Sequence, residues 1–189
     1  MIRAGSNYLA VCVVVMVSLT LVSCAPESTS TVYPQDMTGI RPSDEWSDSN
    51  WQAKLPTGWV VEPVFGMREA SFRVIGSAGD EAEVSISRLP IQGGTLASNV
   101  NRWRVQAGLE PWADEQVISK LTKISISDYD AFQMEFISPN PDGQSIYGVI
   151  LEEGKDRVFI KFSGTSALME SQLEAWHFFV ENLELYHEH

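Results

Sequence analysis

The chain has 189 residues, of which 44% are hydrophobic and 10% are aromatic, and this is enough to build one globular unit with a core. Its 25 acidic and 13 basic residues give a formal net charge of −12. This charge argues against nucleic acid or an anionic lipid surface as a partner, because phosphate groups are bound by clustered Lys and Arg.

The N-terminal residues 1–23 have the pattern of an export signal. Arg3 precedes an uncharged, largely apolar run from Tyr8 to Val22, as in a signal peptide. The run ends in Leu21-Val22-Ser23-Cys24, which resembles the lipobox of bacterial lipoprotein signal peptides. The resemblance implies cleavage before Cys24, acylation of Cys24, and attachment to a membrane through two or three acyl chains.

An uncleaved transmembrane helix is the alternative for this run. The run is near the short end of the roughly 17 to 25 residues that span a bilayer, and no basic residue follows it closely to stop transfer. Ala25 occupies the position where Asp retains many Gram-negative lipoproteins in the inner membrane. In a Gram-negative cell the sequence therefore favours the outer membrane, with the protein on its periplasmic side.

Residues 24–50 are predicted to form a lipidated N-terminus and a flexible tether. From Pro26 onward this segment is rich in Ser, Thr, Asp and Pro and has few large apolar residues, so it cannot bury enough surface to offset the entropy of ordering. The folded unit is predicted over 51–189. It contains no cysteine, since Cys12 and Cys24 are the only two, which excludes a disulfide framework or a Cys-based zinc site there.

Seven strands are predicted in the folded unit, at 59–62, 70–75, 82–89, 124–127, 131–137, 145–152 and 157–163. Within 82–89, Val84 and Ile86 alternate with Ser85 and Ser87, the period of a strand with one solvated face. The segment 138–143 is a loop by composition.

Two main helices and one short helix are predicted. The first runs between a capping Thr95 and a terminating Gly108, with Leu96, Val100, Trp103 and Ala107 in one apolar stripe. A short helix is predicted over 113–121, and a long one over 166–183. The fold class is therefore α+β, an antiparallel sheet of about six to seven strands with two main helices packed on one or both faces.

This order of elements, from Leu55-Pro56-Thr57-Gly58-Trp59 to the last helix, resembles the Mog1/PsbP-like fold. The sequence Gly93-Gly94 followed by Asn99-Val100-Asn101-Arg102-Trp103-Arg104, Gln106 and Gly108-Leu109 is also similar to a motif of secreted or lipid-anchored bacterial proteins of that general shape. The resemblance implies an assembly, partner-binding or ligand-binding module without a shared catalytic centre, although a fold does not confer a function.

The first main helix carries the candidate binding surface, formed by Asn99, Asn101, Arg102, Arg104 and Gln106. Asn99, Arg102 and Gln106 are spaced three and four residues apart and share one face, where they could bind a carboxylate or a peptide backbone. The alternative is structural: the asparagines cap neighbouring loops, the arginines pair with surface acids, and Trp103 anchors the core.

The sequence contains no recognisable catalytic, cofactor or metal site. His177 is the only histidine within a predicted element, while His187 and His189 lie in the terminal tail. There is no Gly-x-Ser-x-Gly elbow and no Gly-rich phosphate loop. Three hypotheses remain: an envelope lipoprotein that binds a protein or small ligand, an envelope hydrolase or transferase with an unrecognised site, and a structural or assembly-supporting lipoprotein.

Overall fold

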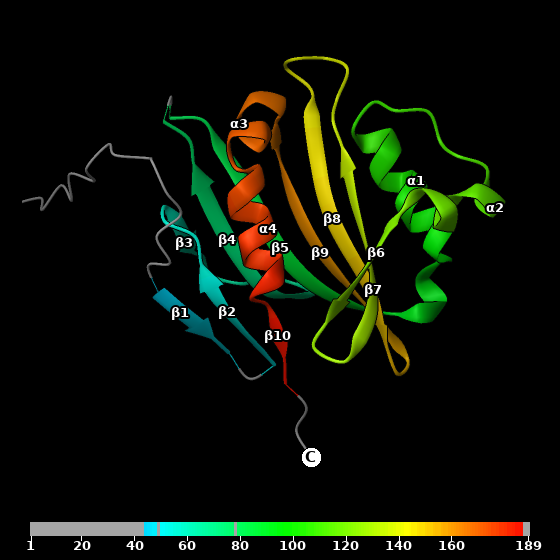
Figure 1. Cartoon of the computed structure of the whole chain (residues 1–189), viewed down its shortest axis with the longest axis horizontal. Helices are drawn as coiled ribbons and strands as arrows, with labels where there is room; N and C mark the ends of the chain where they lie inside the picture. The colour runs from blue at the N-terminus through cyan, green and yellow to red at the C-terminus, as the bar shows by residue number, and fades with distance from the viewer. Residues whose placement is uncertain (1–43, 49, 78, 187–189) are drawn as a thin grey trace, which may run out of the picture. The chain divides into compact units, whose positions relative to one another are not determined.

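The computed structural model describes residues 44–48, 50–77 and 79–186, all of which belong to the unit Met37–His189 (Figure 1). The predicted signal peptide, the lipid attachment residue Cys24 and the first part of the predicted tether lie outside the described residues. Within the described ranges, no helix has the length and apolar character needed to cross a membrane.

A sheet of seven strands forms the centre of the fold. Its order is β3-β4-β5-β9-β8-β7-β6, and every neighbouring pair is antiparallel. The strands are β3 (Trp59–Val61), β4 (Arg68–Ile75), β5 (Glu81–Pro90), β6 (Thr122–Ile126), β7 (Tyr129–Phe136), β8 (Gln144–Glu153) and β9 (Asp156–Thr165). The predicted α+β class with an antiparallel sheet is confirmed.

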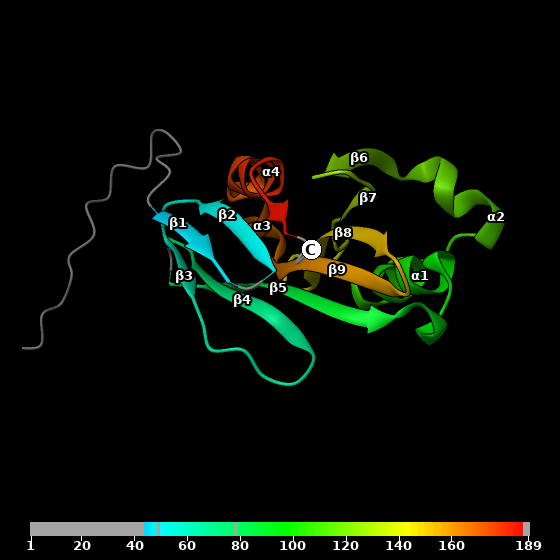
Figure 2. The ribbon, with the colours of Figure 1, turned by 90° about the horizontal axis from the view of Figure 1, so that it is seen from below.

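Helices cover both faces of this sheet (Figure 2). Strand β8 shows this directly, since its alternate side chains point to opposite faces. Tyr147 and Val149 share a core with Trp176 of α4 (Leu173–Glu181), whereas Ile146 and Ile150 share a second core with helix α1 (Leu96–Gln106). We call these two sides the α4 face and the α1 face.

The C-terminal helix is divided, which corrects the prediction of one continuous helix over 166–183. Helix α3 (Ser166–Ser171) and helix α4, which runs from Leu173 to Glu181, are separated by Gln172. Gln172 is buried and has φ −106° and ψ 8°, and its Oε1 accepts a hydrogen bond of 3.1 Å from Trp59 Nε1. Because this partner lies 113 positions earlier, the helical pattern alone gives no sign of the break.

A second, smaller sheet corrects the predicted boundary at residue 51. It has the order β1-β2-β10, with β1 (Asp44–Ser47), β2 (Trp51–Leu55) and β10 (Glu184–Leu185). Strand β1 lies within the range predicted as tether, but it pairs with β2 over four residue pairs. The Trp46 ring also packs edge-on against Phe72, at 4.9 Å between centroids. The folded unit therefore includes β1.

Short helical turns connect the larger elements. The 3₁₀ turn η1 (Ile91–Gly93) precedes α1, and α2 (Asp114–Val117) continues into η2 (Ile118–Lys120) before β6. A short helix in the region 113–121 is therefore confirmed. The capping residue of α1 is Thr95, as predicted, since its side chain accepts a hydrogen bond from the backbone N–H of Ser98.

Candidate functional site

Two of the five predicted surface residues hold α1 to the loop after it. Asn101 binds both backbone groups of Trp112: its Nδ2 donates to the carbonyl and its Oδ1 accepts from the N–H, each at 2.8 Å. Arg104 Nε donates to the carbonyl of Glu110 at 2.8 Å, and its guanidinium lies 3.8 Å from the centroid of the Trp112 ring. Burial lowers the pKa of Arg104. Both side chains are therefore engaged within the fold.

Asn99 and Trp103 also face inward from α1. Asn99 is 2% exposed, its Nδ2 donates to the carbonyl of Thr95 at 2.8 Å, and its Oδ1 accepts from Arg102 Nη2 at 2.6 Å. Trp103 is 4% exposed and packs on β8 and β9 in the second core. Asn101 and Trp103 therefore fit the structural alternative, whereas Asn99 hydrogen-bonds to Thr95 and Arg102 of its own helix rather than to a neighbouring loop.

Arg102 and Gln106 are the two predicted residues that are exposed on α1. Gln106 Oε1 accepts a hydrogen bond of 2.9 Å from Nζ of Lys161, which lies on β9. Lys161 belongs to the same side of β9 as Phe159, the side that α1 packs against. The exposed part of α1 is therefore joined to the neighbouring strands of the sheet.

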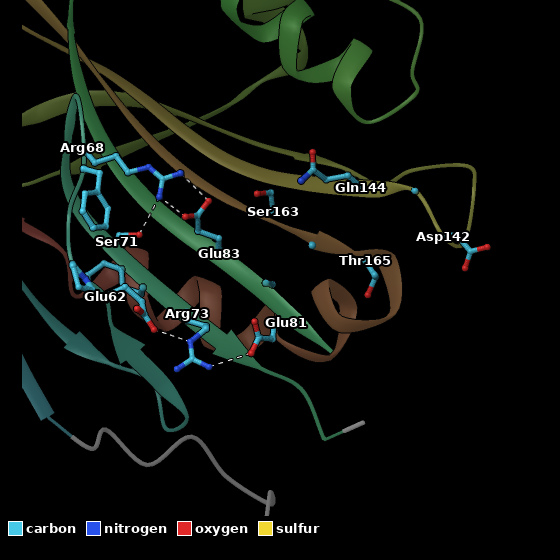
Figure 3. Close-up of a pocket in the computed structure, with 16 residues that line it drawn as sticks. Glu62, Arg68, Ser71, Arg73, Glu81, Glu83, Asp142, Gln144, Ser163 and Thr165 are labelled. Carbon is cyan, nitrogen blue, oxygen red and sulfur yellow. Dashed lines mark hydrogen bonds and ion pairs between the residues drawn. The ribbon is translucent and has the colours of Figure 1, made fainter. Parts of the chain in front are cut away.

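Beside α1 lies a cavity of about 610 Å³ on the strands β4, β5 and β9 (Figure 3). Ten of its 16 lining residues have charged or polar side chains, and we call this surface the polar face. The residues that define it are Glu62, Arg68, Arg73, Glu81, Glu83, Gln144 and Ser163. Sequence reasoning did not identify this surface, because its members come from separate segments and meet only through strand register.

The charges of the polar face are paired with one another. Arg68 binds Glu83 through two contacts, one of them 2.9 Å between Nη2 and Oε2. Arg73 binds Glu62 at 2.7 Å and Glu81 at 3.1 Å. These carboxylates raise the pKa of Arg73, with Glu62 contributing most. These Arg–Glu pairs are partly exposed, so their guanidinium donors and carboxylate acceptors can still be reached from solvent. Because the two signs alternate, neither sign of charge is concentrated.

Lys161 connects the polar face to the exposed part of α1. Burial is the main cause that lowers the pKa of Lys161; the positive charges of Arg102 and Arg68 add to this effect, and Glu83 opposes it. Of these three charged residues, Arg102 lies on α1, Arg68 on β4 and Glu83 on β5. Lys161 lies next to Ser163 of the polar face on the same side of β9, and its Nζ bonds to Gln106, so Gln106 lies next to the polar face.

A second cavity, of about 540 Å³, lies between α4 and the strands β6 and β7. His177 and Glu135 meet there, with 3.0 Å between Nε2 and Oε1, and Lys120 lies over the Trp112 ring at 5.1 Å. Thr122 and Ser125 of β6 also line this cavity, and a histidine–carboxylate pair alone does not identify a catalytic site.

The potential metal ligands of the described chain are dispersed. Within 44–48, 50–77 and 79–186 there is no group of three or more His, Cys, Asp or Glu side chains that could hold an ion. His187 and His189 lie outside these ranges.

No protein-family model matches the chain, and no curated protein matches it. Among solved structures, it is similar to the solution structure of the cyanobacterial PsbP protein CyanoP from Synechocystis sp. PCC 6803, with 14% identity, a TM-score of 0.49, and coverage of 82% of this chain and 99% of that one. It is also similar to LpqN, which is involved in cell envelope biogenesis of Mycobacterium tuberculosis, with 11% identity, a TM-score of 0.47, and coverage of 74% and 87%. Similarity at this level carries no information on activity, ligand or partner.

Proposed function

We propose that this protein is a lipid-anchored, non-catalytic component of the bacterial cell envelope whose folded unit binds a partner protein through the polar face. The anchor is a lipid on Cys24, left after removal of residues 1–23, and the residues between Cys24 and β1 form the tether. Two sequence features support the anchor: the uncharged apolar run and the Leu21-Val22-Ser23-Cys24 segment. In a Gram-negative cell, Ala25 favours the outer membrane.

One observation carries the binding role: the polar face is open, and its Arg and Glu side chains alternate in sign across neighbouring strands (Figure 3). Small-molecule sites are usually enclosed and mostly apolar with a few convergent polar groups. A broad surface that offers guanidinium donors beside carboxylate acceptors instead matches the polar part of a protein–protein interface, where charge complementarity selects the partner.

Site-specific photocrosslinking in growing cells tests this role. A benzophenone amino acid is placed at Gln144, which belongs to the polar face, at Gln106, which is bonded to Lys161 beside it, and at Glu174, which is exposed on α4. We expect a discrete crosslinked product in the envelope fraction from the first two positions and not from Glu174.

The double variant Arg68→Glu with Arg73→Glu then tests whether the charges matter. It places like charges beside Glu62, Glu81 and Glu83, so the crosslinked product should be lost while near-UV circular dichroism shows an intact core. The same product from Glu174, or a product that persists in the double variant, would contradict binding through the polar face.

A further inference from the structure

The loop that joins β3 to β4 is apolar and exposed. It contains Pro63, Val64, Phe65, Gly66 and Met67, and we call it the apolar loop. The exposed fractions are 49% for Val64, 77% for Phe65 and 70% for Met67. Gly66 has φ +68°, a conformation that favours glycine and turns the chain at this point. Figure 2 shows the connection between β3 and β4 extending beyond the sheet, away from α4.

Exposed large hydrophobic residues are concentrated at this position. Of the ten such residues in the described part of the chain, five lie between Val60 and Met67. The others, such as Val105 on α1 and Ile118 in η2, are scattered. Single exposed apolar residues are ordinary on protein surfaces, but a contiguous group marks a surface that contacts a protein or a membrane.

The charges on either side of the apolar loop are neutralised within the fold. Glu62 precedes it and pairs with Arg73 at 2.7 Å, while Arg68 comes directly after it and pairs with Glu83. The five residues of the loop carry no charge themselves. An unpaired charge is costly to bring into the edge of a bilayer, and the apolar loop would bring none.

The proposed anchor keeps a bilayer within reach of this loop. Asp44, where β1 begins, lies 20 positions after Cys24, and an extended chain of that length spans about 70 Å at roughly 3.3–3.6 Å per residue. The net charge of −12 disfavours attraction to anionic lipid. Insertion would therefore depend on apolar contact with a zwitterionic surface.

We propose that the apolar loop inserts into the interface of the phospholipid bilayer that holds the lipid on Cys24, as a second membrane contact. This inference rests on the proposed lipid anchor. Phe65 also lines the cavity of the polar face, so insertion of the loop fixes how the polar face is turned relative to the bilayer.

Fluorescence of a labelled cysteine tests the proposal on the full protein purified from membranes. Once Cys24 is acylated and Cys12 removed, Met67→Cys supplies a single free thiol for an environment-sensitive dye, and Val105→Cys, which replaces a residue 59% exposed on α1, supplies the matched control. In phosphatidylcholine vesicles we expect a blue shift at position 67 and about twofold or greater quenching by spin-labelled lipid, with neither at position 105. Adding Val64→Ser and Phe65→Ser should abolish both signals at position 67.

The outcomes separate the loop from the anchor. Mass spectrometry of the same sample reports whether Cys24 carries acyl groups. If Cys24 is acylated but the label at position 67 shows no more blue shift or quenching than the label at position 105, the loop proposal alone is overturned. Protein without acyl mass overturns the anchor. Because Cys24 is then a second free thiol, the loop is tested in that case on Met67→Cys combined with Cys12→Ser and Cys24→Ser: a blue shift with vesicles supports the loop, and its absence overturns the loop as well. A blue shift that appears without vesicles, or only when an envelope protein is added, shows that protein covers the loop and overturns the proposal.

Discussion

Trp103 of α1 lies against Gly148 of β8 so closely that a Cβ added to Gly148 would be 2.2 Å from Cζ3 of the indole. This contact seats α1 on the sheet and thereby places Arg102 and Gln106 beside the polar face. The Trp103 ring also meets Phe159 edge-on, at 5.9 Å between centroids. The tryptophan in the helix and the glycine in the strand are therefore complementary, although 45 positions separate them in the sequence.

Gly148→Ala should destabilise the protein. The added methyl group must displace the indole of Trp103, and overpacking of a core typically costs about 1–3 kcal/mol. The free energy of unfolding in urea measures the effect. Gly93→Ala is the control, because a Cβ there would meet no atom within 4 Å, and its change should stay within about 0.5 kcal/mol. Equal stabilities of the two variants would contradict this account of how α1 is held.

Asn101→Ala should act on stability rather than on partner binding. It removes both hydrogen bonds to the backbone of Trp112, and leaving such groups unpaired costs about 1–3 kcal/mol. Gln106→Ala removes an exposed amide bound to Lys161, and its effect on unfolding should stay within about 0.5 kcal/mol. Chemical denaturation of both variants checks this, and a larger loss for Gln106→Ala would show that the assignment of the two amides is reversed.

The raised pKa of Tyr147 should lower the free energy of unfolding as the pH rises from about 10 to about 12. Burial, aided by the charges of Glu135 and Glu170, raises the pKa of Tyr147 to about 12, whereas an unfolded tyrosine titrates near 10. The folded state therefore keeps its proton while the unfolded state releases one, so the stabilisation is complete below pH 10 and is lost toward pH 12. Unfolding free energies between pH 8 and 12 should fall less steeply for Tyr147→Phe, and identical slopes would contradict the assignment.

Arg157→Met should lower the free energy of unfolding, because Arg157 holds the segment that precedes α1. The Arg157 side chain is 5% exposed; it pairs with Glu152 and donates through Nη1 to the carbonyl of Gly94, just before α1. Hydrogen bonds to charged groups typically contribute about 1.5–3 kcal/mol. Glu152→Gln is the control, since that side chain is 53% exposed. In thermal and urea unfolding, Arg157→Met should be clearly less stable than Glu152→Gln. The opposite order would exclude Arg157 as the stabilising partner of Gly94.

Local patterns in the sequence predicted most of the main sheet and the start of α1. The alternation of Val84 and Ile86 with serines identifies β5, and Thr95 marks the helix start because its side chain can accept a hydrogen bond from the first turn of the helix. The break at Gln172 and the strand β1 were not predicted. The break depends on Trp59, which lies 113 positions before Gln172. Strand β1 pairs with β2, which follows it closely in the sequence, but its polar composition resembles that of a tether, and its packing also depends on Phe72.

The candidate surface was predicted only in part, for a related reason. Helical spacing places Asn99, Arg102 and Gln106 on one face but does not reveal which of them is buried. Burial of Arg104 depends on stacking over Trp112 in the loop after α1, and the polar face depends on the register of β4, β5 and β9. The register aligns Arg73 with Glu83 and Glu83 with Ser163, and no local pattern encodes such pairs.

Metabolic labelling with an alkyne fatty acid tests the lipid anchor most directly. We expect the wild-type protein to be labelled and to float with membrane vesicles, and Cys24→Ala to be neither labelled nor membrane-bound. Equal labelling of the two proteins, or a mature protein that retains Met1 and carries no acyl mass, would contradict the lipid anchor.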